Sequence, residues 1–130
     1  MNIPGNLKYT REHEWVLVQG KTATIGVTDF AQGELGDVVF VELPEVGKAA
    51  VGLKPVGTIE AVKTVADIFA PVTGQVVAVN TELGERPELV NASPYDKGWM
   101  VKIEMSKPEE LNALLDAEAY RQLVEGGVEA

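Results

Sequence analysis

The stretch that decides the fold is GTIEAVKTVADIFAPVTGQVVAVN, residues 57–80. Two apolar runs rich in β-branched residues flank a single basic residue, Lys63, and such runs are typical of strands. We therefore predict a β-hairpin with Lys63 at its tip. The tip lacks the Asn-Gly or Gly-first sequence that two-residue hairpin loops prefer, so the pattern gives the position of the turn but not its type.

The pairing of these two strands depends on the turn that is assumed. If residues 62–65 form a four-residue turn, Ala61 faces Ala66 and Glu60 faces Asp67. Because side chains alternate between the two faces of a strand, one face is then apolar and buried, while the other face opposes two carboxylates. The residues expected on the buried face are Ile59, Ala61, Ala66 and Ile68.

A lone amine between acidic side chains has two interpretations. Lysines are common in exposed turns, and the acids of Glu60 and Asp67 could simply keep the tip soluble. Alternatively, Lys63 is a nucleophile presented to a modifying enzyme that recognises the rigid tip and its carboxylates. Acylation would then remove the charge and leave a long swinging arm.

The rest of the chain is predicted to form a mostly β body with helices at its C-terminal end. Strands are expected over residues 15–18, 23–27, 37–43, 75–80 and 98–104, and Thr28 is a plausible N-cap of a short helix after the second of them. Roughly eight short strands separated by Gly and Pro turns, with no long helix before residue 106, indicate an all-β sandwich of antiparallel sheets.

The last part of the chain, residues 106–126, is predicted to be a helical extension packed on the sandwich. Ser106 and Glu109 have the spacing of a capping box, so we expect a helix through Leu115. Asp116 can cap a second short helix, which Gly126 would end. We expect residues 1–130 to form one domain.

Composition excludes several classes of function. The 20 acidic and 11 basic residues give a net charge of -9, which disfavours nucleic acid or an anionic membrane as a partner. With no cysteine and one histidine, the chain offers no disulfide, no thiolate nucleophile and none of the usual zinc sites. No stretch approaches membrane-spanning length, and the first residues resemble neither a secretion signal nor a transit peptide. We expect a cytoplasmic bacterial monomer, with a mature mitochondrial form left open.

The only histidine, His13, lies between Glu12 and Glu14. It could be a base with a raised pKa, but an ordinary surface histidine is the expectation we adopt. Trp15 and Trp99 are expected to be core aromatics.

Beyond these patterns, the chain resembles the H proteins of the glycine cleavage system. Around Lys63 the match comprises EAVKT at residues 60–64 and APVTG at residues 70–74. Further matches follow in order along nearly the whole chain: KYT (8–10), HEWV (13–16), GVTDFAQ (26–32), LGD (35–37), VELPEVG (41–47), NASPY (91–95) and GW (98–99). Several motifs in order are far more specific than one lysine in a turn.

Related families and this chain differ at identifiable positions. Biotin carriers usually flank their lysine with methionines, where this chain has Val62 and Thr64. Lipoyl domains of the 2-oxoacid dehydrogenases usually place Asp directly before the lysine. The H-protein family itself usually has Ser where this chain has Ala61, and some members carry a histidine where it has Glu34.

The resemblance implies a barrel-sandwich hybrid of the lipoyl/biotinyl type and a carrier rather than an enzyme. Lys63 would be amide-linked to lipoate and would shuttle the aminomethyl group of glycine from the pyridoxal-phosphate glycine decarboxylase to the tetrahydrofolate-dependent aminomethyltransferase. Dihydrolipoamide dehydrogenase would reoxidise the arm, and a lipoate ligase or octanoyltransferase would attach it. Glu14 and the residues near Glu34 and Asp67 would line the groove that receives the loaded arm.

Two alternatives stay open at this point. An H-like lipoyl relay would donate lipoate from Lys63 to other enzymes without glycine turnover. An unmodified interaction module would use the acidic surface to bind a basic protein partner.

Overall fold

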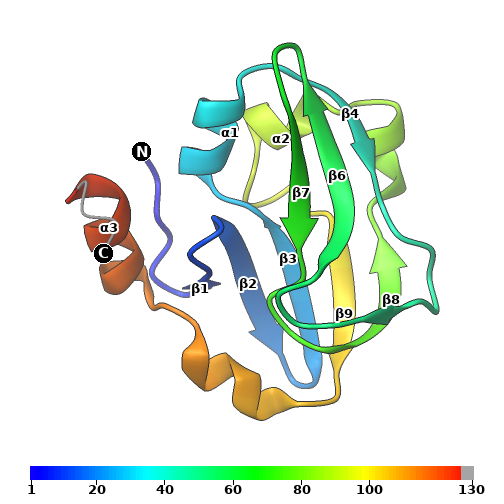
Figure 1. The fold of residues 1–130 in the computed structure, drawn as a ribbon, viewed down its shortest axis with the longest axis vertical. Coiled ribbons are helices and arrows are strands. Elements are labelled where there is room, and N and C mark those ends of the chain that lie inside the picture. The colour runs from blue at the N-terminus through cyan, green and yellow to red at the C-terminus, as the bar shows by residue number, and fades with distance from the viewer. Residues whose placement is uncertain (127–130) are drawn as a thin grey trace.

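The computed structural model describes residues 1–126 and is mostly β, with two antiparallel sheets (Figure 1). Within those residues the larger sheet has six strands, in the order β1 (Lys8–Tyr9), β2 (Glu14–Gln19), β3 (Thr22–Val27), β9 (Val101–Met105), β8 (Gly74–Val79) and β5 (Ala49–Ala50). The smaller sheet has three, in the order β4 (Val38–Glu42), β6 (Pro55–Ala61) and β7 (Val65–Phe69). The predicted hairpin around Lys63 is therefore confirmed as β6–β7, and the strands predicted over residues 15–18 and 23–27 pair with each other as β2 and β3.

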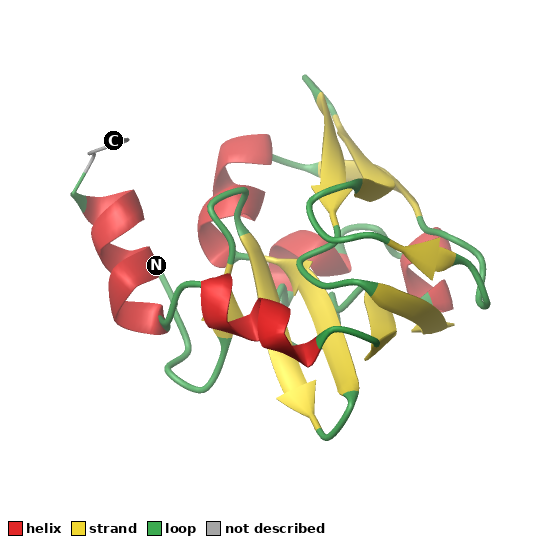
Figure 2. Cartoon of the chain, turned by 60° about the horizontal axis from the view of Figure 1, so that its bottom comes forward, coloured by secondary structure: helices red, strands yellow, loops and turns green. Residues whose placement is uncertain are grey.

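Short helices surround the sheets, as Figure 2 shows. They are α1 (Asp29–Leu35), the 3-10 helix η1 (Thr81–Gly84), α2 (Leu89–Ala92), the 3-10 helix η2 (Pro108–Ala113) and α3 (Ala117–Glu125). Helix α1 begins as expected, because the Thr28 hydroxyl accepts a hydrogen bond from the Ala31 N–H at 3.1 Å. Asp116 caps α3 in the same way, accepting from the Ala119 N–H at 2.8 Å.

The main core fills the space between the two sheets. Its most deeply buried side chains come from both sheets, and they include Ile25, Ile59, Ile68, Val76 and Ile103. Burying a branched aliphatic side chain of this kind contributes about 1.5–3 kcal/mol to folding. The hairpin that carries Lys63 is therefore anchored in the core by Ile59 and Ile68.

A second apolar cluster lies where the N-terminal segment, β1 and α3 meet. It comprises Ile3, Leu7, Tyr9, Trp15, Tyr120 and Leu123. The rings of Tyr9 and Tyr120 stack with their centroids 4.6 Å apart and their planes 8° from parallel. Helix α3 is thus attached to the body through aromatic packing. The predicted single domain also includes residues 127–130, which lie outside the described range.

The predicted register of the β6–β7 hairpin was wrong by two residues. Glu60 faces Val65 and Thr58 faces Asp67, so the two carboxylates are not directly opposed. The Ala61 N–H donates to the Thr64 carbonyl at 2.8 Å, which places the turn one residue earlier than assumed. Because side chains repeat every two residues along a strand, a two-residue shift leaves each face unchanged, and the predicted buried face is confirmed for Ile59, Ala61 and Ile68.

Two further expectations differ from the structure in the last part of the chain. The capping box is absent: Lys107 is the N-cap of η2, and the Ser106 hydroxyl instead donates to the Thr73 carbonyl at 3.4 Å. The predicted closing strand begins later, at Val101, and Trp99 is only half-buried, with the Lys102 ammonium 5.2 Å from its ring centroid. The short strands β1 and β5 carried too little pattern to be predicted.

Candidate functional site

The tip of the β6–β7 hairpin stands clear of the sheets at the top of Figure 1. The turn consists of Val62 and Lys63, which lie between the two residues joined by the hydrogen bond from the Ala61 N–H to the Thr64 carbonyl. The Val62 N–H donates to the Asp37 carbonyl at 3.1 Å, which ties the tip to the segment that precedes β4. The Lys63 side chain is exposed. Hydrogen bonds thus fix the backbone of the tip on both sides, while the Lys63 amine is exposed to solvent.

The carboxylates named from the sequence lie at different distances from this tip. Glu60 is exposed on the outer face of the smaller sheet, and its position faces Val65 on one side and Phe40 on the other. Asp67 is also exposed, two residues further from the tip than Val65. The tip is therefore acidic on one face without a directly opposed acid pair.

Exposed apolar side chains beside Lys63 were not foreseen from the sequence. Val39 and Phe40 are about half exposed, and Val62 and Val65 are more so. A register shift between Val38 and Phe40 interrupts the alternation of β4, so consecutive apolar residues face outward. The uninterrupted run of four apolar residues at 38–41 was the available indication.

A pocket of about 270 Å³ lies between the hairpin, α1 and the start of β2. It brings together three of the predicted residues, Glu14, Glu34 and Asp67, whereas Glu60 is not part of it. Its other lining residues are Glu12, His13, Val27, Phe30, Ala31, Leu35, Ile59 and Ala66. The pocket therefore combines an apolar wall with several carboxylates.

Glu14 is the buried acid of this pocket, with 1% of its surface exposed. The Thr10 hydroxyl donates to its Oε1 at 2.6 Å, and the Phe69 N–H donates to its Oε2 at 3.2 Å. Burial raises the pKa of Glu14 to about 7, although both hydrogen bonds act in the opposite direction. At neutral pH this carboxyl is poised between its two forms, so a nearby cation would favour the ionised one.

His13 is half-buried at the pocket wall rather than an ordinary surface residue, which corrects our expectation. Its backbone has φ of 74°, in the left-handed region. Its Nδ1 lies 2.8 Å from the Tyr120 hydroxyl, and its ring centroid lies 4.8 Å from that of Phe30. Tyr120 is 107 residues away in the chain, and no sequence pattern indicated this contact.

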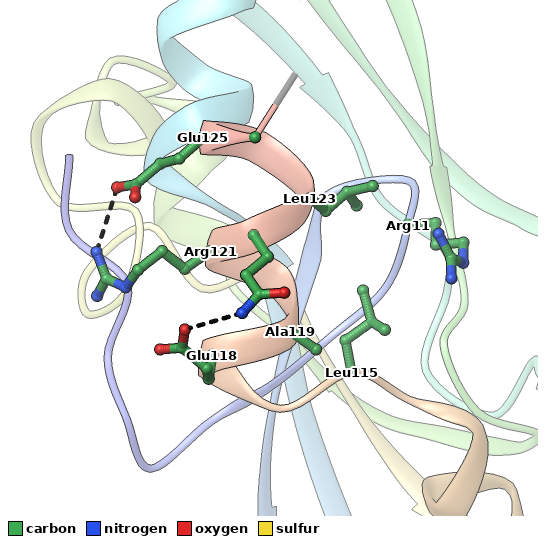
Figure 3. Close-up of a pocket in the computed structure, with 9 residues that line it drawn as sticks. Arg11, Leu115, Glu118, Ala119, Arg121, Leu123 and Glu125 are labelled. Atoms are coloured by element: carbon green, nitrogen blue, oxygen red, sulfur yellow. Dashed lines mark hydrogen bonds and ion pairs between the residues drawn. The ribbon is translucent and has the colours of Figure 1, made fainter. Parts of the chain in front are cut away.

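A second pocket lies beside α3 and contains none of the predicted site residues (Figure 3). Leu115, Ala119 and Leu123 line it together with Arg11. The polar contacts drawn there run along the helix itself, from Arg121 to Glu125 and from Gln122 to Glu118, both at 3.3 Å. Exposed pairs at this spacing add only about 0.3–0.5 kcal/mol to a helix. We assign this pocket no part in the site.

Two further findings concern metal binding and membrane-spanning helices among the described residues. Among residues 1–126, no group of three or more His, Asp or Glu side chains has an arrangement that could hold a metal ion. In the same range, every helix is too short or too polar to cross a membrane.

Comparison with known proteins gives a consistent result. Residues 7–127 match the family model described as glycine cleavage H-protein. The glycine cleavage system H protein of Anoxybacillus flavithermus is 57% identical over 124 residues, which cover 95% of this chain and 98% of the relative. The protein of the same name from Bacillus mycoides is 56% identical over 123 residues, covering 95% and 97%.

A solved structure agrees with these sequence matches. The crystal structure of a glycine cleavage system H protein from Mycobacterium marinum superposes with a TM-score of 0.86 at 36% sequence identity. The superposition covers 97% of this chain and the whole of that one. The similarity therefore extends over both sheets and the terminal helices, and not over the hairpin alone.

Proposed function

The chain belongs to the glycine cleavage H-protein family, and from this premise we propose that Lys63 is the residue that carries lipoate. As a member, the chain is a lipoyl carrier of the glycine cleavage system and not an enzyme. The fold has the form expected of such a carrier, a lipoyl-type barrel-sandwich hybrid. We further infer that residues 1–130 act as one carrier domain, with 106–126 as its helical extension.

The observation that carries this proposal is the exposed Lys63 side chain on a tip whose strands are anchored in the core. A modifying enzyme needs an accessible amine on a backbone that keeps its conformation when the enzyme binds. The hydrogen bonds of Ala61 and Val62 supply the second property. Bound lipoate would supply a disulfide that accepts and later yields the one-carbon amine fragment of glycine.

The pocket between the hairpin and α1 fits a resting place for the loaded arm. Apolar side chains such as Phe30, Leu35 and Ile59 suit the hydrocarbon part of the arm, and a carboxylate suits an amine cargo. Glu14 is the group best placed to pair with that amine, because it is buried and already held by two hydrogen bonds. Asp67 and Glu34 add negative charge at the same pocket.

The body of the protein contributes in two physical ways. Tethering raises the effective concentration of the arm at each partner, and a covered pocket keeps water from the cargo between partners. Neither contribution requires the chain to catalyse a step.

Membership of the glycine cleavage system implies the other proteins of that system as partners. We propose that these are glycine decarboxylase, the aminomethyltransferase and dihydrolipoamide dehydrogenase, together with a lipoate ligase or octanoyltransferase that modifies Lys63. The relatives compared above are bacterial, which supports a bacterial source, and we propose that the chain acts in the cytoplasm.

The test is glycine exchange. Lipoylated chain, glycine decarboxylase, unlabelled glycine and labelled bicarbonate should give glycine labelled in its carboxyl group, because the carboxyl carbon leaves and is replaced reversibly. The Lys63→Arg variant should give none. A lipoyl relay would be modified at Lys63 yet fail to support exchange, so that result would contradict the carrier function while retaining the attachment site. An unmodified interaction module would show neither modification nor exchange.

A further inference from the structure

The pocket proposed above for the loaded arm is called the arm pocket below. The Tyr120 hydroxyl lies between His13, which lines this pocket, and Thr28, which caps the helix α1 that forms another of its walls. It is 2.8 Å from Nδ1 of His13, on the turn before β2, and 2.7 Å from the Thr28 hydroxyl, which caps α1. The Tyr120 side chain is completely buried. His13 and both turns of α1, through Phe30, Ala31, Glu34 and Leu35, line the pocket. Helix α3 thus contacts the walls of the pocket through the Tyr120 side chain, whose ring also meets the His13 ring edge-on with the centroids 5.7 Å apart.

One backbone hydrogen bond connects the same parts, and a second hydrogen bond fixes the start of α1. The Thr28 N–H donates to the His13 carbonyl at 3.1 Å, and the Thr28 hydroxyl accepts from the Ala31 N–H at 3.1 Å. Burial raises the pKa of Tyr120 above its usual range, so its hydroxyl keeps its proton. A protonated hydroxyl can donate one hydrogen bond and accept another, which matches its two neighbours.

Core packing alone accounts for the ring of Tyr120 but not for its hydroxyl. The ring stacks on Tyr9 and belongs to the apolar cluster under α3. A phenylalanine would preserve that stacking. The hydroxyl, in contrast, adds polar contacts to two pocket walls, and buried polar groups are costly unless they are satisfied.

We propose that Tyr120 is a positioning residue of the arm pocket, holding the His13 turn and the start of α1 in the arrangement that shelters the loaded arm. The inference rests on the proposed function of the pocket, because shelter has meaning only if the arm rests there. It adds a role for the C-terminal helix, which does not itself line the pocket.

The first experiment uses the unloaded full chain and compares Tyr120→Phe with Tyr9→Phe. Tyr9 is a matched control, because its ring is the other half of the stack while its hydroxyl donates to the Pro4 carbonyl, away from the pocket. In Tyr120→Phe the amides of Thr28 and Ala31 should exchange with solvent about tenfold faster, and the ring nitrogens of His13 should change their chemical shifts. Tyr9→Phe should leave both unchanged. The proposal would be overturned if the two variants had the same amide exchange rates at Thr28 and Ala31 and the same chemical shifts of the His13 ring nitrogens.

A measurement on the unaltered chain serves if Tyr120→Phe does not fold. A hydroxyl proton held between His13 and Thr28 should exchange slowly enough to appear in the proton spectrum, with cross-peaks to both residues. A hydroxyl proton in fast exchange with water would contradict the proposal.

The second experiment uses the loaded protein and separates this inference from the function it rests on. Spontaneous loss of the aminomethyl cargo should be about threefold faster in Tyr120→Phe and unchanged in Tyr9→Phe. Glu14→Gln reports on the pocket itself and should also speed the loss. If Glu14→Gln speeds the loss and Tyr120→Phe does not, the positioning role is wrong and the resting place stands. If neither variant changes the loss, the resting place is wrong.

Discussion

The tip and the base of the β6–β7 hairpin differ in almost every physical respect although only a few residues separate them. At the tip, Lys63 is exposed and the neighbouring Val62 and Val65 are among the most exposed apolar residues of the described chain. At the base, Ile59 and Ile68 are almost completely buried. The comparison shows how one element can offer an amine to other proteins while its position is fixed by the core.

The same contrast separates attachment from protection. The proposed attachment at Lys63 would depend on the exposure of its amine, so substitutions there should change modification and leave the stability unchanged. In the proposed function, protection of the cargo would depend on the pocket, where the buried Glu14 carboxylate accepts hydrogen bonds from the Thr10 hydroxyl and the Phe69 N–H. Substitutions there should change stability, its pH dependence and the lifetime of the cargo.

The largest effect on stability is expected at the base of the hairpin. Ile68→Ala should lower the free energy of unfolding by about 2–5 kcal/mol, because it removes a buried side chain and leaves a cavity. Val65→Ala, on the exposed face of the same strand, should stay within about 0.5 kcal/mol of the parent. Urea denaturation of both variants makes the measurement. Similar losses in the two would show that the tip is not independent of the core.

A smaller effect is expected from the buried acid of the pocket, and it depends on pH. The pKa of Glu14 rises from 4.5 to about 7 on folding, so its contribution to stability is fully present below about pH 4.5 and is lost as the pH rises through about 7. Between about pH 5 and about pH 8 the parent should lose about 2–3 kcal/mol relative to Glu14→Gln. Denaturation of both proteins at the two pH values measures this difference. Parallel pH profiles would contradict the assigned pKa.

The smallest effect is expected at the acidic face of the tip. Glu60→Gln should leave the stability within about 0.5 kcal/mol, because the residue is exposed. If the modifying enzyme recognises this carboxylate, the initial rate of lipoylation should fall about threefold, as for the loss of one exposed ion pair. Glu42→Gln, on the same sheet and further from the tip, is the matched control. Equal rates for the two variants would remove Glu60 from recognition.

The hairpin and its buried face could be predicted because apolar alternation is a local property of the chain. Its register could not, because the tip residues Val62 and Lys63 give no preferred turn type and the bond between Ala61 and Thr64 decides the pairing. The error was an even number of residues, so the assignment of faces survived it while the predicted opposition of Glu60 and Asp67 did not.

Elsewhere the errors come from contacts between distant segments. Ser106 has the spacing of a cap, but its hydroxyl bonds to Thr73, and Glu110 accepts from both the N–H and the hydroxyl of Thr73 at 2.6 and 2.7 Å. The family resemblance, and not a local pattern, pointed to Glu14, Glu34 and Asp67; all three line one pocket, and its role as a resting place for the arm stays a proposal. The contact between His13 and Tyr120 joins residues 107 positions apart, so no local sequence pattern could predict it.

The most direct test of the account is the mass of the peptide that contains Lys63. After expression with lipoate, this peptide should be heavier by one lipoyl group, while the peptide containing Lys48, another exposed lysine, keeps its unmodified mass. In Lys63→Arg the added mass should disappear from the whole protein. A lipoyl group found on another lysine, or an unmodified Lys63 in cells that lipoylate other proteins, would contradict the central claim that this exposed tip is the attachment site.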